Sequence, residues 1–382
     1  MHVFISAGEP SGDLHGANLI RELKKIDPAV RLSGFGGDRM EAAGCQLLYP
    51  LCNHSVMWIL SVVQQIFTFI RLLNEAQEFF RAQRPDVIVV IDYPGFHWKL
   101  AQRAKKEGIP VVYFVPPQIW AWGQWRVKKM KRLMTQVLSA LPFEHDWLNK
   151  RGVHSTYIGH PYFDELASQK LDETFLIAEK SRSGRIVGIL PGSRNQEVAR
   201  NVPEMLRAAR LIHQELPNTR FLIAAFNGLQ ADLVRDVASR WKMPVDVHVG
   251  CTPEIISLSE CCIAVSGSVS LEIMYRQTPA MIVYRLPRIT LKIARRLVKV
   301  KWITLVNLLA KEAVFPEFIT DRDPSKALGA RVIQMLNDPA EQATVRQKLA
   351  ELCDRFARPG ACESAARCIE RIARTPHMHN SN

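Results

Sequence analysis

Short apolar runs that alternate with helical patterns constrain the fold of this chain more than any other feature. Continuous runs such as "VIVVI" and "FLIAAF" suit strands that are covered on both faces, and their alternation with helices predicts parallel βαβ units. The predicted strands form two series, 2–7, 31–35, 87–91, 111–115, 136–140 and 156–159, followed by 186–190, 220–225, 245–249, 262–266 and 281–284.

Two such series predict an α/β protein with two doubly wound, Rossmann-like domains that face each other across a cleft. The polar and charged stretch 168–185 marks the boundary between them. We therefore expect a first domain at 1–167 and a second at 168–345. Residues 346–382 are expected to form a helical tail, whose helices could cross back to the first domain.

The net charge of +13 favours anionic partners such as nucleic acid, anionic lipid or phosphorylated substrates. The amino-terminal sequence lacks a signal-peptide pattern, and the eight cysteines contain no C-x-x-C pair, which indicates reduced thiols in a cytoplasmic protein. The segment 55–70, "SVMWILSVVQQIFTFI", has no charged residue, but it is shorter than the roughly 20 residues of a membrane span. It is either a core helix or a helix that enters one leaflet.

Chemically interesting residues follow the strands of the first series, where open α/β sheets bind their ligands. In "AGEPSGDLHGA", Gly8 allows a tight loop, Ser11 is a candidate N-cap, and Glu9 and Asp13 could cap the helix or bind sugar hydroxyls. Asp92 directly follows the predicted strand 87–91. A carboxylate at this position suits a general base, and equally a helix cap or a salt bridge.

Two further segments combine basic and apolar side chains. Residues 116–132, "PPQIWAWGQWRVKKMKR", place three tryptophans among five basic residues, which fits a membrane interface, a nucleic acid, or core tryptophans beside a solvated basic face. Residues 288–302, "RITLKIARRLVKVKW", are amphipathic at helical spacing, which is typical of a membrane-surface helix and also of an ordinary basic helix.

In the second series, a strand, a glycine turn and a helix start predict an anion site at "LPGSRNQEV", with Gly192, Ser193 and Arg194. In "SGSVSLE", Gly267 makes a turn, Ser268 or Ser270 can cap, and Glu272 suits the helix dipole or the hydroxyls of a ribose. The fingerprint G-x-G-x-x-G is absent, which disfavours a nicotinamide or flavin enzyme.

Nine ordered blocks together carry a family resemblance: "SAGEPSGDLHGA", "GFGGDRMEAAG", "IDYPGF", "WAWGQWRVKKM", "LPFE", "YIGHP", "LPGSRNQEV", "SGSVSLE" and "VNLLA". The chain resembles lipid-A-disaccharide synthases, which are inverting glycosyltransferases of the B-type fold. The resemblance implies transfer of 2,3-diacylglucosamine from UDP-2,3-diacylglucosamine to the 6-hydroxyl of 2,3-diacylglucosamine 1-phosphate (lipid X). The products would be the β-1,6 lipid A disaccharide 1-phosphate and UDP. The resemblance also implies peripheral attachment to the cytoplasmic face of the bacterial inner membrane. It implies a reaction that uses no cofactor and no metal.

The resemblance assigns roles to matching positions. Asp92 corresponds to the proposed base, Glu9 to a second carboxylate of the acceptor site, and Arg194 to the cation that neutralises departing UDP. The expected donor-binding residues are Gly192, Ser193, Arg194, Gly267, Ser268, Glu272, Arg285 and Asn307, and the expected acceptor-binding residues are Gly8, Ser11, Asp13 and Gln118. The expected membrane or acyl-chain contacts are Val56, Met57, Trp58, Ile59, Ile66, Phe67, Phe69 and Ile70.

The block "IDYPGF" departs from the pattern, because many members have a second aspartate where Gly95 stands and an asparagine where His97 stands. This departure puts in doubt any mechanism that needs a carboxylate pair in that loop. The alternatives are a soluble UDP-sugar epimerase of the same fold and a non-enzymatic binder of nucleic acid or membrane. An exposed apolar segment at 55–70 could also be the face of a homodimer.

Overall fold

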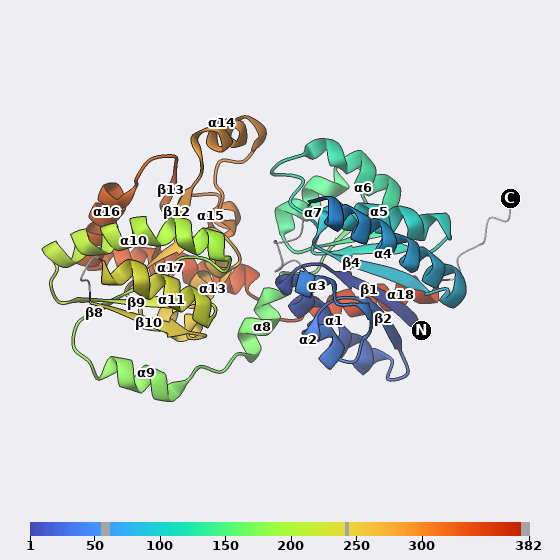
Figure 1. The fold of residues 1–382 in the computed structure, drawn as a ribbon, viewed down its shortest axis with the longest axis horizontal. Helices are drawn as coiled ribbons and strands as arrows, with labels where there is room; N and C mark the ends of the chain where they lie inside the picture. Colours follow the sequence, from blue (N-terminus) through green and yellow to red (C-terminus); the bar gives the residue numbers. More distant parts are fainter. Residues whose placement is uncertain (55–61, 241–243, 376–382) are drawn as a thin grey trace. The chain divides into compact units, whose positions relative to one another are not determined.

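The computed structural model describes residues 1–54, 62–240 and 244–375, which fall into two compact units (Figure 1). The first unit contains residues 1–165 and the described residues from Arg358 onward, and the second contains residues 166–357. The carboxyl-terminal helix α18 (Ala361–Arg374) therefore belongs to the unit that holds the amino terminus, where it packs against α1 (Pro10–Ile26).

The first unit is built on a seven-stranded sheet with the strand order β3-β2-β1-β4-β5-β6-β7. Every neighbouring pair is parallel. The strands are β1 (His2–Ala7), β2 (Arg31–Phe35), β3 (Gln46–Tyr49), β4 (Val87–Ile91), β5 (Val111–Phe114), β6 (Gln136–Ser139) and β7 (Ser155–Tyr157).

Helices cover both faces of this sheet, because successive side chains of a strand point to opposite faces. Val3 and Ile5 of β1 pack with α1 and α18, whereas Phe4 packs with the helices of the other face. The helices are α1, α2 (Asp38–Ala42), α3 (Leu51–His54), α4 (Val62–Gln83), α5 (Pro94–Lys106), α6 (Val127–Leu133), α7 (Pro142–Asn149) and α18, with a short 3₁₀ helix at Gln124–Arg126. Helix α8 (Tyr162–Ser168) contains the division between the units.

The second unit has a six-stranded parallel sheet with the order β10-β9-β8-β11-β12-β13. Its strands are β8 (Arg185–Leu190), β9 (Thr219–Ala225), β10 (Val245–Val249), β11 (Cys261–Val265), β12 (Ala280–Arg285) and β13 (Glu317–Thr320). Its helices are α9 (Glu173–Lys180), α10 (Asn195–Glu215), α11 (Gly228–Ser239), α12 (Thr252–Leu258), α13 (Val269–Tyr275), α14 (Arg288–Leu297), α15 (Leu305–Ala310), α16 (Ser325–Asn337) and α17 (Pro339–Phe356).

The prediction of two doubly wound α/β units with parallel sheets is confirmed, and a carboxyl-terminal helix returns to the first unit. The chain divides between Glu165 and Leu166, and the segment expected as a tail is shared, since α17 lies in the second unit and α18 in the first. Both sheets contain an edge strand that the sequence pattern did not predict, β3 and β13. Their side chains are only partly buried, so their sequences lack the continuous apolar run of a central strand.

The apolar segment 55–70 lies partly outside the described residues, which resume at α4. Helix α14 ends at Leu297, so the predicted amphipathic helix is shorter than the segment 288–302. Among the residues that the structure describes, we find no helix with the length and hydrophobicity of a membrane span.

Candidate active site

In the first unit, the residues that follow β1 and β4 lie side by side because these strands are parallel neighbours. Ala7 pairs with Ile91 at the carboxyl ends of the two strands. Gly8 and Glu9 continue from β1, and Asp92 and Tyr93 continue from β4. The ring of Tyr93 lies against Gly8, and a Cβ atom at Gly8 would be 2.3 Å from Cδ1 of that ring. This close approach excludes any larger residue at position 8 unless the ring moves.

The backbone of Asp92 has a left-handed conformation that hydrogen bonds stabilise. Asp92 and Tyr93 both have a positive φ, 50° and 46°, a conformation that costs about 1–3 kcal/mol per residue and is concentrated at functional sites. The carbonyl oxygen of Asp92 accepts hydrogen bonds from Nδ1 of His97 (2.7 Å) and from the hydroxyl of Tyr113 (2.8 Å). These two donors, both on buried side chains, hold the turn that carries the carboxylate.

His97 connects this turn to the centre of the sheet. Its Nδ1 donates to the carbonyl of Asp92, so the neutral ring has an acceptor at Nε2, where the hydroxyl of Ser6 lies at 2.8 Å. Burial lowers the pKa of His97 to about 4, so the ring is neutral at pH 7. The sequence marked His97 only as a departure from the family pattern, because its partner Ser6 is far away along the chain.

Glu9 stands at the N-cap position of α1, where it is partly buried. Burial raises the pKa of Tyr93, and the negative charge of Glu9 contributes in the same direction. The predicted cap at Ser11 is wrong, since α1 already begins at Pro10 and Ser11 is an exposed residue of its first turn. Proline at the first position explains the earlier start, because its missing N–H costs nothing there.

Asp13 has a structural role in this unit. Its carboxylate is buried and accepts hydrogen bonds from the backbone amides of Gly37, Arg39 and Met40, at 2.8–3.1 Å. These amides belong to the start of α2, where a negative charge is favourable. Both carboxylate oxygens therefore bind the protein itself, and the predicted contact of Asp13 with the acceptor remains a prediction.

Gln118 lies exposed on the loop that follows β5. The loop begins at Val115, whose φ of 53° is rare for a β-branched residue. Nε1 of Trp120 donates to the buried carboxyl group of Glu144 at 2.9 Å. Burial raises the pKa of Glu144 to about 8, although hydrogen bonds from Trp120 and from the amides of Ala140 and Leu141 act to lower it. This contact anchors the loop that presents Gln118.

Four buried histidines of this unit, His2, His15, His97 and His160, make its stability depend on pH. Burial lowers the pKa of His15 and His97 to about 4 and that of His160 to about 3. The unfolded chain binds protons below about pH 6.5, whereas the folded unit binds them only near pH 4, so unfolding becomes easier as the pH falls through this window. Glu144 acts in the opposite direction, because its pKa is raised.

We therefore expect His97→Gln to weaken the pH dependence of stability. The loss of unfolding free energy between about pH 7 and pH 5 should be smaller than in the wild type by about 2 kcal/mol. Equilibrium urea unfolding at both pH values measures this difference, and His154→Gln, at an exposed position, is the matched control. An unchanged pH dependence in His97→Gln would contradict the assignment of a neutral buried ring.

In the second unit, the predicted anion loop lies between β8 and the long helix α10. Gly192 has a φ of 125°, and a Cβ atom there would be 2.9 Å from Oε2 of Glu197, so the turn requires glycine. Arg194 occupies the N-cap position of α10, is 67% exposed, and lies 3.1 Å from Oε1 of Glu197. Ser193 is exposed beside it. The amides and dipole of the helix start, together with the guanidinium, favour an anion.

Gln230 holds this loop and was missed by the sequence analysis. Its side chain is buried and donates to the carbonyl of Ser193 (2.8 Å) and to Oδ1 of Asn195 (3.1 Å). It also accepts from the amide of Phe226 at 3.1 Å. The side chain thus ties the loop after β8 to the loop after the neighbouring strand β9. No local motif indicates such a contact, because its partners lie far apart in the sequence.

The second predicted donor motif follows β11. Gly267 has open space where a Cβ atom would stand, and Ser268 occupies the N-cap position of α13 without a capping bond from its side chain. Ser270 does not cap either, because its hydroxyl donates to the carbonyl of Gly267. Glu272 is buried, with Oε1 3.3 Å from Nε of Arg276.

Arg285 and Asn307 contact other residues of the second unit. Arg285 forms an ion pair with the buried Glu204 of α10. The side chain of Asn307 is fully buried, donates to the carbonyl of Phe315 (2.7 Å) and to Glu317 (2.9 Å), and accepts from the amide of Phe315. Asn307 therefore joins α15 to the start of β13, and its predicted contact with the donor remains a prediction.

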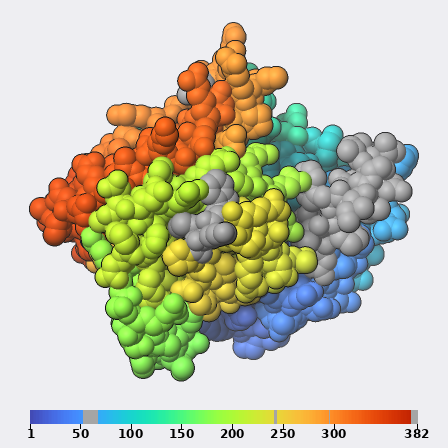
Figure 2. Space-filling model, turned by 60° about the vertical axis from the view of Figure 1, so that its left-hand side comes forward, coloured from blue at the N-terminus to red at the C-terminus, as the bar shows by residue number. Residues whose placement is uncertain are grey.

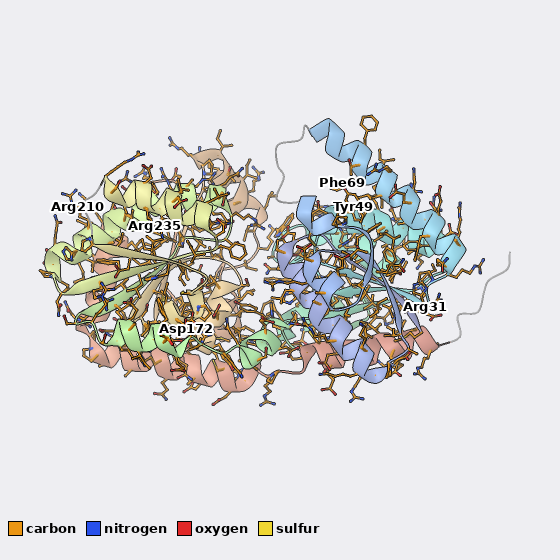
Figure 3. All side chains as sticks on the ribbon, turned by 60° about the horizontal axis from the view of Figure 1, so that its bottom comes forward. Arg31, Tyr49, Phe69, Asp172, Arg210 and Arg235 are labelled. Atoms are coloured by element: carbon orange, nitrogen blue, oxygen red, sulfur yellow. The ribbon has the colours of Figure 1, made fainter. Side chains whose placement is uncertain are left out.

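Exposed apolar and aromatic side chains of the first unit occur on α4 and in the segment that leads into α6. Phe67 (69%) and Ile70 (48%) are exposed on α4, and Trp122 and Trp125 are exposed beside Arg126, whose guanidinium lies 4.5 Å from the ring centre of Trp122. Phe69, labelled in Figure 3, instead packs against the rings of Tyr93 and Phe96. Of the other predicted lipid contacts, Val56, Met57, Trp58 and Ile59 lie outside the described residues, as does the side chain of Ile66.

The two parallel-sheet units have the B-type glycosyltransferase fold, and this fold defines the class of the protein. Two solved structures share it across the chain at low identity. A UDP-GlcNAc 2-epimerase from Neisseria meningitidis bound to UDP-GlcNAc has a TM-score of 0.66, 12% identity, and coverage of 97% of this chain and 100% of its own. MurG of Acinetobacter baumannii has a TM-score of 0.56, 13% identity, and coverage of 97% and 99%.

Sequence comparison identifies the family within this class. The family described as lipid-A-disaccharide synthetase matches residues 3–372, and the chain belongs to it. A lipid-A-disaccharide synthase from Trichlorobacter lovleyi is 35% identical over 360 residues, which cover 94% of each chain. The chain is thus a glycosyltransferase with a role in lipid A disaccharide synthesis, and the epimerase alternative is not favoured.

Proposed function

We propose that the enzyme transfers 2,3-diacylglucosamine from UDP-2,3-diacylglucosamine to the 6-hydroxyl of lipid X, which forms the β-1,6-linked disaccharide 1-phosphate and UDP. The observation that carries this proposal is Asp92, a carboxylate residue held at the end of β4 by the bonds of His97 and Tyr113 to its carbonyl oxygen. Asp92 takes the proton of the 6-hydroxyl as that oxygen attacks the anomeric carbon. Glu9, on the neighbouring strand end, is the alternative base or a ligand of sugar hydroxyls.

The bond between the anomeric carbon and the UDP oxygen breaks as the new bond forms, and UDP leaves with the electron pair. Arg194 and the amides at the start of α10 stabilise the negative charge that develops on the diphosphate. Gly192 and Ser193 give the diphosphate close access to that backbone, and Gly267 and Ser268 do the same at α13. The nucleotide part of the donor is supported by Glu272, Arg285 and Asn307. Their ion pairs and hydrogen bonds within the second unit hold the loops around the nucleotide.

The acceptor is held by the loops of the first unit. Gly8, Ser11 and Gln118 contact lipid X, while Asp13 shapes this region through α2. The exposed side chains of α4, with Trp122, Trp125 and the basic residues around them, contact an anionic membrane surface and guide acyl chains. The enzyme accordingly works at the cytoplasmic face of the inner membrane. The alternative is that this apolar surface forms the interface of a homodimer.

Product formation tests the reaction directly. The purified protein in mild detergent is mixed with UDP-2,3-diacylglucosamine and lipid X, with EDTA or with Mg²⁺, and mass spectrometry detects the tetraacyl disaccharide 1-phosphate. We expect product under both conditions, because Arg194 and the helix start supply the positive charge at the diphosphate. If product forms with Mg²⁺ but not with EDTA, this account of how the leaving group is stabilised is incomplete. No product, with conversion of UDP-GlcNAc instead, would favour the soluble epimerase.

A further inference from the structure

Helix α14 carries an exposed row of apolar side chains. Ile289, Ile293 and Leu297 are 74%, 53% and 47% exposed, and their spacing of four residues places them on one side of the helix. The helix (orange) projects from the body of the second unit in Figures 1 and 2. Single exposed apolar residues are common, but a row of three on a projecting helix indicates a contact with something apolar.

The row points away from the unit that carries it. Among the described side chains of this helix, Leu291 is buried, with 4% exposure, so its side faces the protein. Since each residue of a helix advances by about 100°, Leu291 lies roughly opposite the centre of the row formed by Ile289, Ile293 and Leu297. The apolar row is therefore presented outward.

Positive charge borders the row. Arg288, Lys292 and Arg296 are exposed and form a second line along the helix, next to the apolar one. An acidic group lies near the first of them, since Oδ2 of Asp321 is 3.9 Å from Nε of Arg288. Between Glu272 and Glu312 the sequence contains nine lysines and arginines and no acidic residue. An outward apolar row flanked by cations is the arrangement of a helix that lies in the headgroup region of an anionic bilayer.

We propose that the second unit has its own membrane-contact site, in which α14 inserts Ile289, Ile293 and Leu297 among anionic lipids while Arg288, Lys292 and Arg296 bind headgroups. A row of three side chains on a ten-residue helix is too small for a stable protein interface, which buries about 800 Å² per partner. The site rests on the proposed function and deepens it, because a unit that takes a diacylated donor from a bilayer gains from contact with that surface.

Vesicle flotation of the full chain tests this site. The probes are vesicles of phosphatidylcholine alone and of an equal mixture with phosphatidylglycerol. We expect the wild type to bind the mixed vesicles more tightly, and the triple variant I289S/I293S/L297S to bind them at least about tenfold more weakly. The variant R288Q/K292Q/R296Q should lose the preference for phosphatidylglycerol. The control variant Ile177→Ser removes an exposed isoleucine from α9 of the same unit, away from α14, and should bind the mixed vesicles like the wild type.

The outcomes separate this inference from the proposed reaction. Product formation in detergent should be unchanged in all these variants, since the proposed reaction uses none of the substituted side chains. Wild-type binding of the mixed vesicles by both multiple variants would overturn the site. A change of oligomeric state in sedimentation, with unchanged vesicle binding, would overturn it in favour of contact with a second copy. Absence of product in the wild type would refute the proposed reaction, and the vesicle data would still decide the membrane contact.

Discussion

Replacing Asp92 by alanine is expected to lower the turnover number by about 10²–10⁴-fold, the usual contribution of a general base. The dissociation constant of UDP should stay close to that of the wild type, because the predicted nucleotide loops belong to the second unit. The fold of the turn should persist, since His97 and Tyr113 bind the backbone carbonyl of residue 92 and not its side chain. Single-turnover kinetics and calorimetric titration with UDP measure the two effects separately.

The controls for Asp92 distinguish catalysis from folding. Asp146→Asn removes an exposed carboxylate from α7 of the same unit and should leave turnover unchanged. Glu9→Ala removes the second carboxylate of the site. The variant that loses more of the turnover number identifies the base. A fully active Asp92→Ala enzyme would rule out the base assignment. Weakened UDP binding in that variant would mean that Asp92 shapes the protein rather than the reaction.

Arg194→Ala should lower kcat/KM by about 10²–10³-fold, the effect of removing one preplaced group that stabilises a developing negative charge. UDP binding should weaken as well, because the guanidinium attracts the diphosphate before and after transfer. Arg194→Lys should recover part of the loss, since it keeps the charge but not the planar, bidentate geometry. Steady-state kinetics and UDP titration of the three proteins measure these effects.

Arg200→Ala provides the matched control for Arg194. It removes an exposed arginine from the second turn of the same helix, away from the helix start. Both kinetics and UDP binding should remain near wild type. Equal losses in the two variants would mean that the general positive charge of α10 attracts UDP, and that Arg194 has no specific role at the diphosphate.

The central strands were predictable because strands buried on both faces must be continuously apolar. β1, β2, β4 and β10 have the bounds that the sequence predicts, and the other predicted strands differ by one or two residues at one or both ends. At the sheet edges, β7 and β10 were predicted but β3 and β13 were missed. One side of an edge strand meets solvent or loops and its sequence mixes polar and apolar residues, which weakens the signal of such strands. The return of α18 to the first unit was expected only in outline.

The placement of the candidate site residues at strand ends was predictable, because parallel topology brings the carboxyl ends of strands together. This applies to Glu9 and Asp92 in the first unit and to Gly192 and Arg194 in the second. The partners that hold them were not predictable. Ser6 and His97 are separated by 91 residues, and Gln230 and Ser193 by 37, so no local pattern records these contacts.

The sequence alone determined the two parallel sheets, the family and the strand ends where chemistry is expected, because periodicity and ordered motifs are local properties of the chain. The tertiary structure decided how each polar side chain is used. It directs the carboxylate of Asp13 to three backbone amides and buries Asn307 against Phe315 and Glu317. It also turns the apolar row of α14 outward, opposite the buried Leu291. Burial and partners far along the chain set these roles, and both exist only once the chain has folded.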